Sequence, residues 1–259
     1  GRVRLKYYSS YQTRKAGYPV VASVLMPTTP TFLNILLLSS ACNNYDLSSL
    51  KIISYGTEPM PESTLNALNK LFPEVKLLQT YGLIEVGVMR SKSKDNNSLW
   101  VKVGGEGYET RIVNSMLEIK ADSAMLGYLN APCPFTEDGW FITGDAVEQD
   151  GEYIKILGRK SELINVGGEK VYPAEVERVI QELEFITDVE VYGEKNPLSG
   201  NIVCARVKVD DPSNFNNYKE NIRSHCRSKL ERFKVPIKIK MVDQDFHSFR
   251  FKKMRAHDI

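Results

Sequence analysis

Strand-like and helix-like segments alternate over the first third of the chain, and this alternation restricts the possible folds more than any other feature. The apolar segments typical of buried strands are 18–26, 50–54 and 75–79, and helical patterns begin at 29 and cover 61–71. Because the connections are short, the alternation predicts a mostly parallel sheet with packed helices. Ligands of such sheets bind beyond the carboxyl ends of the strands, where the segments 55–59 and 80–85 lie.

Between residues 99 and 157 the pattern changes to short strands joined by tight turns. Asn114-Ser115 separates two alternating runs, and Asp150-Gly151 lies within a later one, so each is a hairpin signal. These signals predict a small antiparallel sheet or barrel. The rest of the chain combines two helical patterns with three strands, at 173–183, about 214–233, 186–192, 202–209 and 237–242.

The predicted fold class is therefore α/β: a mostly parallel sheet layer with helices, a small antiparallel β subdomain, and a small α+β domain at the C-terminus. The corresponding boundaries are 1–98 for part of the α/β subdomain of a large domain, 99–159 for the β-barrel-like subdomain, and 160–259 for the α+β C-terminal lid domain.

The stretch Leu157–Glu177 carries the boundary between the last two parts. It contains Gly158-Arg159 at the end of an apolar strand, the pair Gly167-Gly168, and Pro173 at the first position of a helix. The glycine pair predicts that another group approaches the backbone closely there. Taken alone, the stretch is typical of an ordinary loop between domains.

Leu157–Glu177 resembles the linker of the adenylate-forming superfamily, which includes acyl- and aryl-CoA ligases, luciferases and the adenylation domains of peptide synthetases. Its ending, Gly-Gly-Glu-Lys-Val-Tyr-Pro-Ala-Glu-Val-Glu, is similar to the CoA-ligase branch. The resemblance extends over nearly the whole chain. It implies that Arg159 contacts the ribose and phosphate side of ATP, that Ser161 is a hinge, and that Gly167 and Gly168 line a wall for the arm of the thiol cofactor.

Two motifs in the first third also resemble those of the superfamily. The segment 79–85 is similar to Tyr-Gly-x-Thr-Glu, which implies that Tyr81 stacks on adenine and that Glu85 holds the Mg²⁺ ion of ATP. Ile84 stands where this motif has a hydroxyl side chain. A turn similar to the Gly-Ala/Glu-Pro motif would cover the other face of adenine with Gly56, Thr57, Glu58 and Pro59.

Two further motifs imply a ribose ligand and a catalytic lysine. The segment 139–145 resembles Gly-Trp-x-x-Thr-Gly-Asp, and a carboxylate at such a glycine turn can accept hydrogen bonds from both ribose hydroxyls, so Asp145 is predicted to bind ribose. The segment 245–255 occupies the place of the catalytic-lysine loop. Its alignment assigns catalysis to Lys252, with Lys253 as the alternative.

The superfamily's Ser/Thr/Gly-rich phosphate loop has no counterpart in the sequence. The glycine-rich segment 104–107 precedes a strand rather than a helix, so it predicts a turn between sheets. We therefore expect either the C-terminal portion of a longer enzyme or a short homologue that works with a separate N-terminal partner. The absence of a methionine before Gly1 favours the fragment.

Composition argues against nucleic-acid and membrane partners. The net charge of +2 arises from 34 basic and 32 acidic residues mixed along the chain, which creates no global field. No apolar run reaches the roughly 18 residues of a membrane span, and no secretory pattern occurs. The four cysteines lack C-x-x-C spacing and predict reduced thiols in a cytoplasmic protein.

The resemblance implies an ATP-dependent acid–thiol ligase, which joins a carboxylic acid to AMP and transfers the acyl group to coenzyme A or to the phosphopantetheine of a carrier protein. Lys252 and Mg²⁺ would offset the repulsion between carboxylate and phosphate. Rotation about Ser161 would then bring the glycine pair to the thiol. The alternative hypothesis is a non-catalytic nucleotide- or acyl-binding relic module, because Ile84 and Phe251 depart from the motifs.

Overall fold

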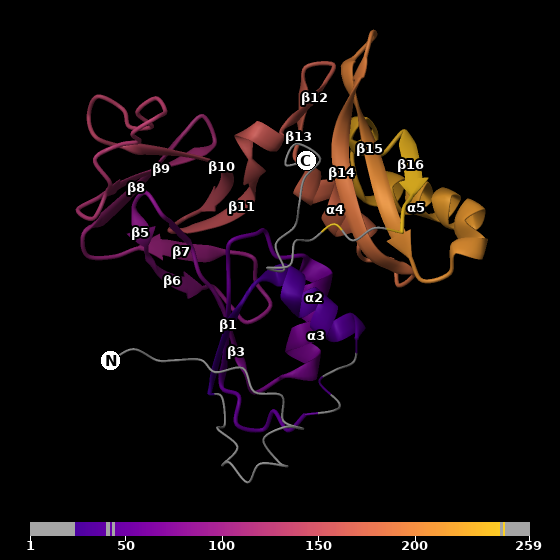
Figure 1. The fold of residues 1–259 in the computed structure, drawn as a ribbon, viewed down its shortest axis with the longest axis horizontal. Coiled ribbons are helices and arrows are strands. Elements are labelled where there is room, and N and C mark those ends of the chain that lie inside the picture. The colour runs from indigo at the N-terminus through magenta and orange to yellow at the C-terminus, as the bar shows by residue number, and fades with distance from the viewer. Residues whose placement is uncertain (1–23, 40–41, 43–44, 244–245, 247–259) are drawn as a thin grey trace.

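The computed structural model describes residues 24–39, 42, 45–243 and 246. These residues form three bodies, each built on its own sheet, with the parallel sheet, the first antiparallel sheet and the C-terminal sheet following one another along the chain (Figure 1). This arrangement confirms the predicted fold class. Within the described residues, no helix is long and apolar enough to cross a membrane.

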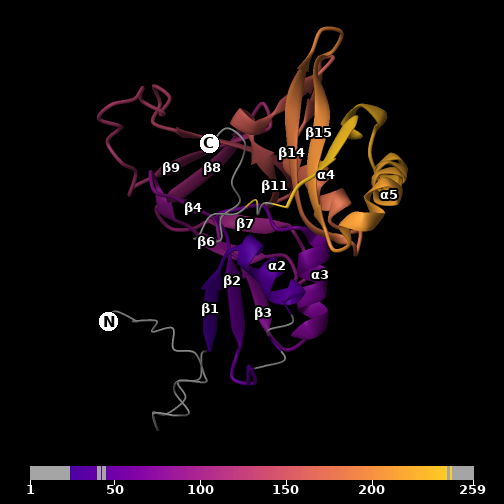
Figure 2. The same ribbon diagram turned by 45° about the vertical axis from the view of Figure 1, so that its right-hand side comes forward.

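The first body is a three-stranded parallel sheet in the order β1-β2-β3, and two helices pack on it (Figure 2). Its elements are β1 (Leu25–Thr28), α2 (Pro30–Leu38), β2 (Ile52–Tyr55), α3 (Glu62–Leu71) and β3 (Lys76–Gln79). Thr29 caps α2 by accepting a hydrogen bond from the backbone N–H of Phe32 at 3.1 Å. Leu33, Ile53 and Leu65 are fully buried in the shared core, as the alternating pattern predicts.

The outer edge of β3 is closed by side chains instead of by another strand. The backbone N–H groups of Leu77, Gln79 and Tyr81 donate to Asn96 Oδ1, Ser93 Oγ and Ser91 Oγ at 3.0, 3.0 and 3.1 Å. Buried backbone donors need such partners, and here they also fix the path of the chain from β3 into Tyr81. The hydrogen bond from the backbone N–H of Tyr81 thus fixes the main chain of the residue that is predicted to contact the nucleotide.

The second body is a six-stranded antiparallel sheet in the order β6-β7-β11-β10-β9-β8. Its strands are β6 (Arg90–Ser93), β7 (Val101–Gly104), β8 (Tyr108–Val113), β9 (Met116–Ala121), β10 (Phe141–Asp150) and β11 (Tyr153–Arg159). The hairpin predicted at Asn114-Ser115 is confirmed, with φ values of 51° and 64° that suit a two-residue turn. β6 was not predicted, and a two-stranded ribbon of β4 (Gly82–Leu83) and β5 (Gly87–Val88) precedes it.

The turn at 104–107 differs from its prediction as a turn between sheets. It joins β7 to β8, which belong to the same sheet, and the backbone N–H of Tyr108 donates to the carbonyl of Gly105 at 3.0 Å. Because β7 and β8 stand near opposite ends of the strand order, the turn brings those ends together and curls the sheet. Gly104 and Gly105 adopt φ values of 130° and 123°, which favour glycine.

The third body contains β12 (Ile164–Val166), β13 (Glu169–Val171), α4 (Pro173–Ile180), β14 (Ile186–Asn196), β15 (Gly200–Val209), α5 (Phe215–Lys229) and β16 (Lys238–Met241). The strands form one sheet in the order β13-β12-β15-β14, and β16 pairs with β15. Helix α5 ends at Lys229, before the predicted end near 233. Leu230 leaves the helix with φ −123° and ψ 153°, and it packs with Phe233 against the core, so burial overrides the helical spacing.

The pair Gly167-Gly168 forms the turn of the β12–β13 hairpin, which was not predicted. The two residues adopt φ values of 62° and 97°, a geometry that glycine provides without strain. Apart from the adjoining residues, no described atom lies within 4 Å of the position that a Cβ would occupy at either residue. The backbone N–H groups are paired within the protein, since Gly167 donates to the carbonyl of Ser199 at 2.8 Å and Gly168 to Asn165 Oδ1 at 2.9 Å. The turn geometry accounts for both glycines.

Candidate functional site

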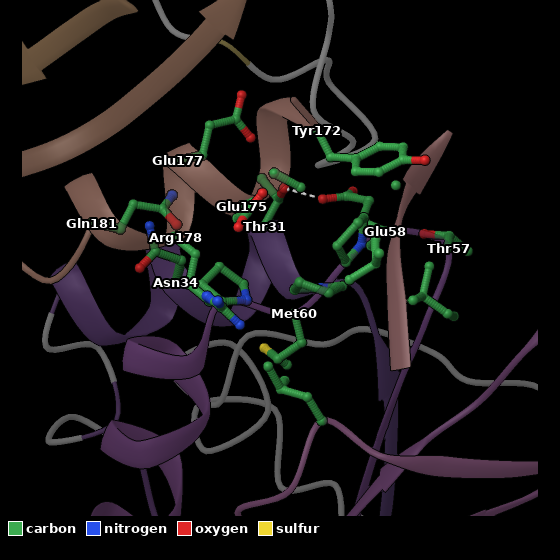
Figure 3. Close-up of a pocket in the computed structure, with 18 of the residues that line it drawn as sticks. Thr31, Asn34, Thr57, Glu58, Met60, Tyr172, Glu175, Glu177, Arg178 and Gln181 are labelled. Atoms are coloured by element: carbon green, nitrogen blue, oxygen red, sulfur yellow. Dashed lines mark hydrogen bonds between the residues drawn. The ribbon is translucent and has the colours of Figure 1, made fainter. Parts of the chain in front are cut away.

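A cavity of about 950 Å³ lies where the three bodies meet. It is lined by α2, the turn after β2, the chain around Tyr81, the end of β11, and residues of α4, β14 and β15. Figure 3 shows the side of this cavity on which α4 faces α2 and the turn that carries Glu58. Its volume is within the usual range for small-molecule sites, and it lies beyond the carboxyl ends of β2 and β3.

Three of the predicted ligand residues meet at the wall of this cavity. Tyr81 donates its hydroxyl hydrogen to Asp145 Oδ2 at 2.5 Å, and Arg159 donates from Nε to Asp145 Oδ1 at 2.9 Å. Asp145 and Arg159 are directly opposite on the neighbouring strands β10 and β11, which explains their contact. Each carboxylate oxygen retains a second acceptor position, so the group can also receive ligand hydroxyls.

Hydrogen bonds through Thr143 tie the main chain at Asp145 to the neighbouring strand β9. The backbone N–H of Asp145 donates to Thr143 Oγ1 at 3.0 Å, and the Thr143 hydroxyl donates to the carbonyl of Leu117 at 2.7 Å. Asp145 is only 5% exposed and Tyr81 only 7%. The sequence Thr-Gly-Asp thus provides both the acid and the hydroxyl that orients its main chain.

Burial dominates the electrostatics of this cluster. It raises the pKa of Asp145 above its usual value, although the Tyr81 hydrogen bond and the Arg159 charge act in the opposite direction. Burial also raises the pKa of Tyr81, and the neighbouring Asp145 charge reinforces that effect. Tyr81 therefore remains a protonated donor, and a ligand that gives further hydrogen bonds to Asp145 would stabilise its ionised form.

The turn after β2 lies against the chain that follows β3. A Cβ at Gly56 would stand 2.6 Å from both the carbonyl oxygen and the hydroxyl of Thr80, so only glycine fits there. Thr57 adopts a φ of 73°, and Glu58 Oε2 accepts a hydrogen bond from Thr31 Oγ1 of α2 at 2.5 Å (Figure 3). Thr57, Glu58 and Pro59 line the cavity, whereas Gly56 allows the two turns to pack.

Glu85 lies outside the residues that line the cavity, on the segment between β4 and β5. Its Oε1 accepts a hydrogen bond from the hydroxyl of Tyr128 at 2.6 Å, and this bond raises the pKa of Tyr128. The described residues contain no group of three His, Cys, Asp or Glu side chains that could hold a metal by themselves. A single carboxylate nevertheless fits Mg²⁺, which commonly takes one or two carboxylates together with substrate phosphates and water.

Two family models match the chain: "AMP-binding enzyme" over residues 23–125 and "AMP-binding enzyme C-terminal domain" over residues 175–249. The chain belongs to the AMP-binding enzyme family. This membership confirms the resemblance seen in the sequence. Asp145 and Arg159 fall between the two matched segments of this AMP-binding enzyme sequence.

Curated relatives within the AMP-binding enzyme family include CoA ligases. The 4-coumarate–CoA ligase 1 of Arabidopsis thaliana is 32% identical over 205 residues, which are 70% of this chain and 36% of the relative. The indoleacetate–CoA ligase of Aromatoleum aromaticum is 27% identical over 245 residues, which are 87% of this chain and 46% of the relative. The chain thus spans less than half the length of these two relatives.

Solved structures share the fold. The anthranilate CoA ligase AuaEII in complex with anthranoyl-AMP has a TM-score of 0.74 and 22% identity, over 89% of this chain and 48% of that one. ATP-bound MatB from Rhodopseudomonas palustris has a TM-score of 0.74 and 24% identity, over 91% of this chain and 50% of that one. At these identities the similarity establishes the adenylate-forming fold of the AMP-binding enzyme family.

Three further predicted residues of this AMP-binding enzyme chain, Ser161, Gly167 and Gly168, follow β11 in the sequence. Ser161 lies in a short 3-10 turn, Lys160–Glu162, that links β11 to β12, and its neighbour Glu162 lines the cavity. The hairpin turn Gly167-Gly168 does not line the cavity. Lys252 and Lys253 lie outside the described residues. The structure therefore groups Tyr81, Asp145 and Arg159 and leaves Ser161 and the hairpin turn apart from them.

One face of α4 contributes cavity residues that were not predicted. Figure 3 shows Glu175 and Arg178 of α4, and Gln181 directly after it, on the cavity wall opposite α2. Arg178 Nη1 stands 3.8 Å from Glu62 Oε2 of α3, so an ion pair joins the first and third bodies. The regular spacing of three residues places these side chains on one helical face, and that spacing was a signal available in the sequence.

Proposed function

We propose that the chain supplies the C-terminal part of an ATP-dependent acid–thiol ligase of the AMP-forming acyl-CoA ligase type. The observation that carries the proposal is the buried Asp145 carboxylate, which Tyr81 and Arg159 hold at the wall of a cavity of about 950 Å³. Family membership and the names of the curated relatives support the reaction class. The phosphate loop would come from an N-terminal region, as part of the same protein or as a separate partner.

In this proposal the cavity holds the adenosine part of ATP and of the acyl-adenylate. Asp145 accepts hydrogen bonds from the two ribose hydroxyls, because each of its oxygens keeps a free acceptor position. Adenine lies between the Tyr81 side and the turn of Gly56, Thr57, Glu58 and Pro59. Arg159, whose side chain is 52% exposed, reaches the phosphate side of the nucleotide.

The proposed first half-reaction joins the acid to AMP. An oxygen of the substrate carboxylate attacks the α-phosphorus of ATP, the bond to the bridging oxygen breaks, and pyrophosphate leaves with the electron pair. Lys252, with Lys253 as the alternative, and Arg159 offset the repulsion between the two anions. When bound, a Mg²⁺ ion on the phosphates would neutralise part of their charge, and Glu85 is the residue that would hold it.

The proposed second half-reaction transfers the acyl group to a thiol. The sulfur of coenzyme A, or of a carrier protein's phosphopantetheine, attacks the acyl carbon, and AMP leaves. Rotation of the third body about Ser161 would bring the Gly167-Gly168 turn to the thiol arm. The space around this turn supports the assignment, since, apart from the adjoining residues, no described atom lies within 4 Å of where a Cβ would stand at either glycine. We place this chemistry in the cytoplasm, with a carboxylic acid as the substrate.

The test of this function compares AMP binding by the chain with AMP binding by two variants. Calorimetry on the chain should detect AMP, and Asp145→Ala should weaken its binding by at least about tenfold, because two hydrogen bonds to a charged acceptor disappear. Asp150→Ala is the matched control, since Asp150 lies on the same strand with a side chain that is 58% exposed. Equal AMP affinity in Asp145→Ala and the parent would refute the nucleotide site.

The second candidate function is a non-catalytic nucleotide- or acyl-binding module. The observation that favours it is Ile84, which is 95% exposed and puts a hydrocarbon where the motif has a hydroxyl. Pyrophosphate exchange with a panel of carboxylic acids, measured on the chain joined to a phosphate-loop region of the family, separates the two functions. Exchange supports the ligase, and AMP binding without exchange supports the module.

A further inference from the structure

Two segments that are distant in the sequence are tied together just after β4, whose residues Gly82 and Leu83 line the cavity. The Ser123 hydroxyl donates to the carbonyl of Val86 at 2.7 Å, and the backbone N–H of Met125 donates to the carbonyl of Glu85 at 2.7 Å. The segment after β9 therefore fixes the main chain at Glu85 from outside the β4–β5 ribbon. This anchoring brings the next part of the same segment, with Tyr128, to the Glu85 side chain.

The Glu85 side chain is oriented by that segment. Tyr128 donates its hydroxyl hydrogen to Glu85 Oε1 at 2.6 Å, across 43 residues of sequence. Ile84, the neighbour at which the motif has a hydroxyl, is 95% exposed and has no hydrogen-bonding group in its side chain. The hydroxyl that reaches the carboxylate thus comes from a different part of the chain. Oε2 remains available for a further ligand.

We propose that Tyr128 is a positioning residue that holds the Glu85 carboxylate in the orientation needed to bind the divalent cation of the nucleotide. This inference rests on the proposed ligase function, in which Glu85 takes the metal. A glutamate has several rotamers, and fixing one of them in advance removes an ordering cost from cation binding. Tyr128 would act through Glu85 and would contact neither the nucleotide nor the cation.

The experiment measures cation binding directly, with Mn²⁺ as the probe and a non-hydrolysable ATP analogue as the nucleotide, because AMP lacks the phosphates that share the cation. Electron paramagnetic resonance, compared with the analogue alone, gives the dissociation constant of Mn²⁺ for the chain with bound nucleotide. Tyr128→Phe should weaken Mn²⁺ binding roughly threefold to tenfold, which corresponds to the ordering of one flexible side chain. AMP affinity measured without metal should stay the same, because Tyr128 is not among the residues that line the cavity.

Tyr108→Phe is the matched control. The Tyr108 hydroxyl lies 3.2 Å from Ser123 Oγ, so this variant loosens the same segment without touching the Glu85 carboxylate. It should leave the dissociation constant of Mn²⁺ unchanged within about twofold. Thermal unfolding of both variants should stay close to the parent, since each loses only a hydroxyl group and keeps its aromatic ring; Tyr128 is also 44% exposed.

The outcomes separate this inference from the proposed function. Unchanged or tighter Mn²⁺ binding in Tyr128→Phe overturns the inference, and so does equal weakening in Tyr108→Phe, which would mean that the segment acts only as a structural anchor. If the parent binds AMP but does not bind Mn²⁺, the positioning role is refuted while the nucleotide site stands. If the parent binds neither, the proposed function fails together with the inference.

Discussion

Replacing Asp145 with asparagine should separate nucleotide binding from folding. The amide keeps the shape of the carboxylate and can still accept a hydrogen bond from Arg159 Nε, while its NH₂ group can donate to the Tyr81 hydroxyl after that hydroxyl rotates. The lost ion pair is worth at most about 1 kcal/mol, because the Arg159 side chain is 52% exposed. Burying a neutral amide also avoids the desolvation that raises the pKa of Asp145. The free energy of unfolding should therefore change little.

AMP binding should respond much more strongly to Asp145→Asn. A hydrogen bond to a charged acceptor contributes about 1.5–3 kcal/mol and one to a neutral acceptor about 0.5–1.5 kcal/mol, so the ribose hydroxyl on the oxygen side of the amide should lose about 1–1.5 kcal/mol. The hydroxyl that faces the NH₂ group loses its acceptor and with it about 1.5–3 kcal/mol. The total loss of about 2.5–4.5 kcal/mol is roughly 60- to 1,600-fold in the dissociation constant. Calorimetry with AMP and thermal unfolding of the same samples provide the two readouts.

The same variant has a distinct pH signature. The folded state raises the pKa of Asp145 above its ordinary value of 3.8, so between these two pKa values the native protein binds more protons at this residue than the unfolded chain does. The free energy of unfolding therefore decreases as the pH rises from 3.8 through the pKa of the folded state. Asp145→Asn removes this decrease. A folded Asp145→Asn protein that binds AMP as tightly as the parent would refute the reasoning about the ribose site.

Three further predictions address packing, pH and catalysis. Gly56→Ala places a Cβ 2.6 Å from the Thr80 carbonyl oxygen, so it should cost about 1–3 kcal/mol and lower the midpoint of thermal unfolding by several degrees. Burial raises the pKa of Glu182, but hydrogen bonds from Lys229 and His225 of α5 lower it, and the net pKa lies below the ordinary value of 4.5. The parent should therefore lose stability as the pH falls below 4.5, and Glu182→Gln should lose less when unfolding is measured at several pH values. In the chain completed by a phosphate-loop region, as the proposed function requires, one of Lys252→Ala and Lys253→Ala should depress pyrophosphate exchange while thiol transfer from supplied acyl-adenylate persists. Normal exchange in both variants would exclude this loop from catalysis.

Local signals in the sequence predicted much of the fold. Asn114-Ser115 suits a two-residue hairpin turn, and Thr29-Pro30 begins a helix, because in both cases the residues themselves determine the backbone geometry. For Gly167-Gly168 the sequence predicted a close approach to the backbone, whereas the pair forms a hairpin turn, because both uses favour glycine. β6 was missed because it lacks an apolar pattern: its residues Ser91 and Ser93 accept hydrogen bonds from the backbone at the edge of β3.

In the candidate site, too, local motifs predicted individual residues, but not the contacts between residues that are distant in the sequence. Asp145 and Arg159 were found by motif, and antiparallel pairing of β10 with β11 then places them opposite each other. The hydrogen bond from Tyr81 to Asp145 spans 64 residues, and the one from Tyr128 to Glu85 spans 43. Tyr128 belongs to an irregular segment with no period to read, so only the folded chain reveals its partner.

The side chains that close the edge of β3 leave the parallel sheet with one edge that can accept a further strand. Asn96, Ser93 and Ser91 occupy the outward N–H groups there, which leaves no ladder for another strand to extend. At the opposite edge, the described part of the chain pairs β1 with β2 alone. A further strand, whichever chain carries it, can therefore join this sheet only beside β1, so assembly of a wider sheet would proceed from that side.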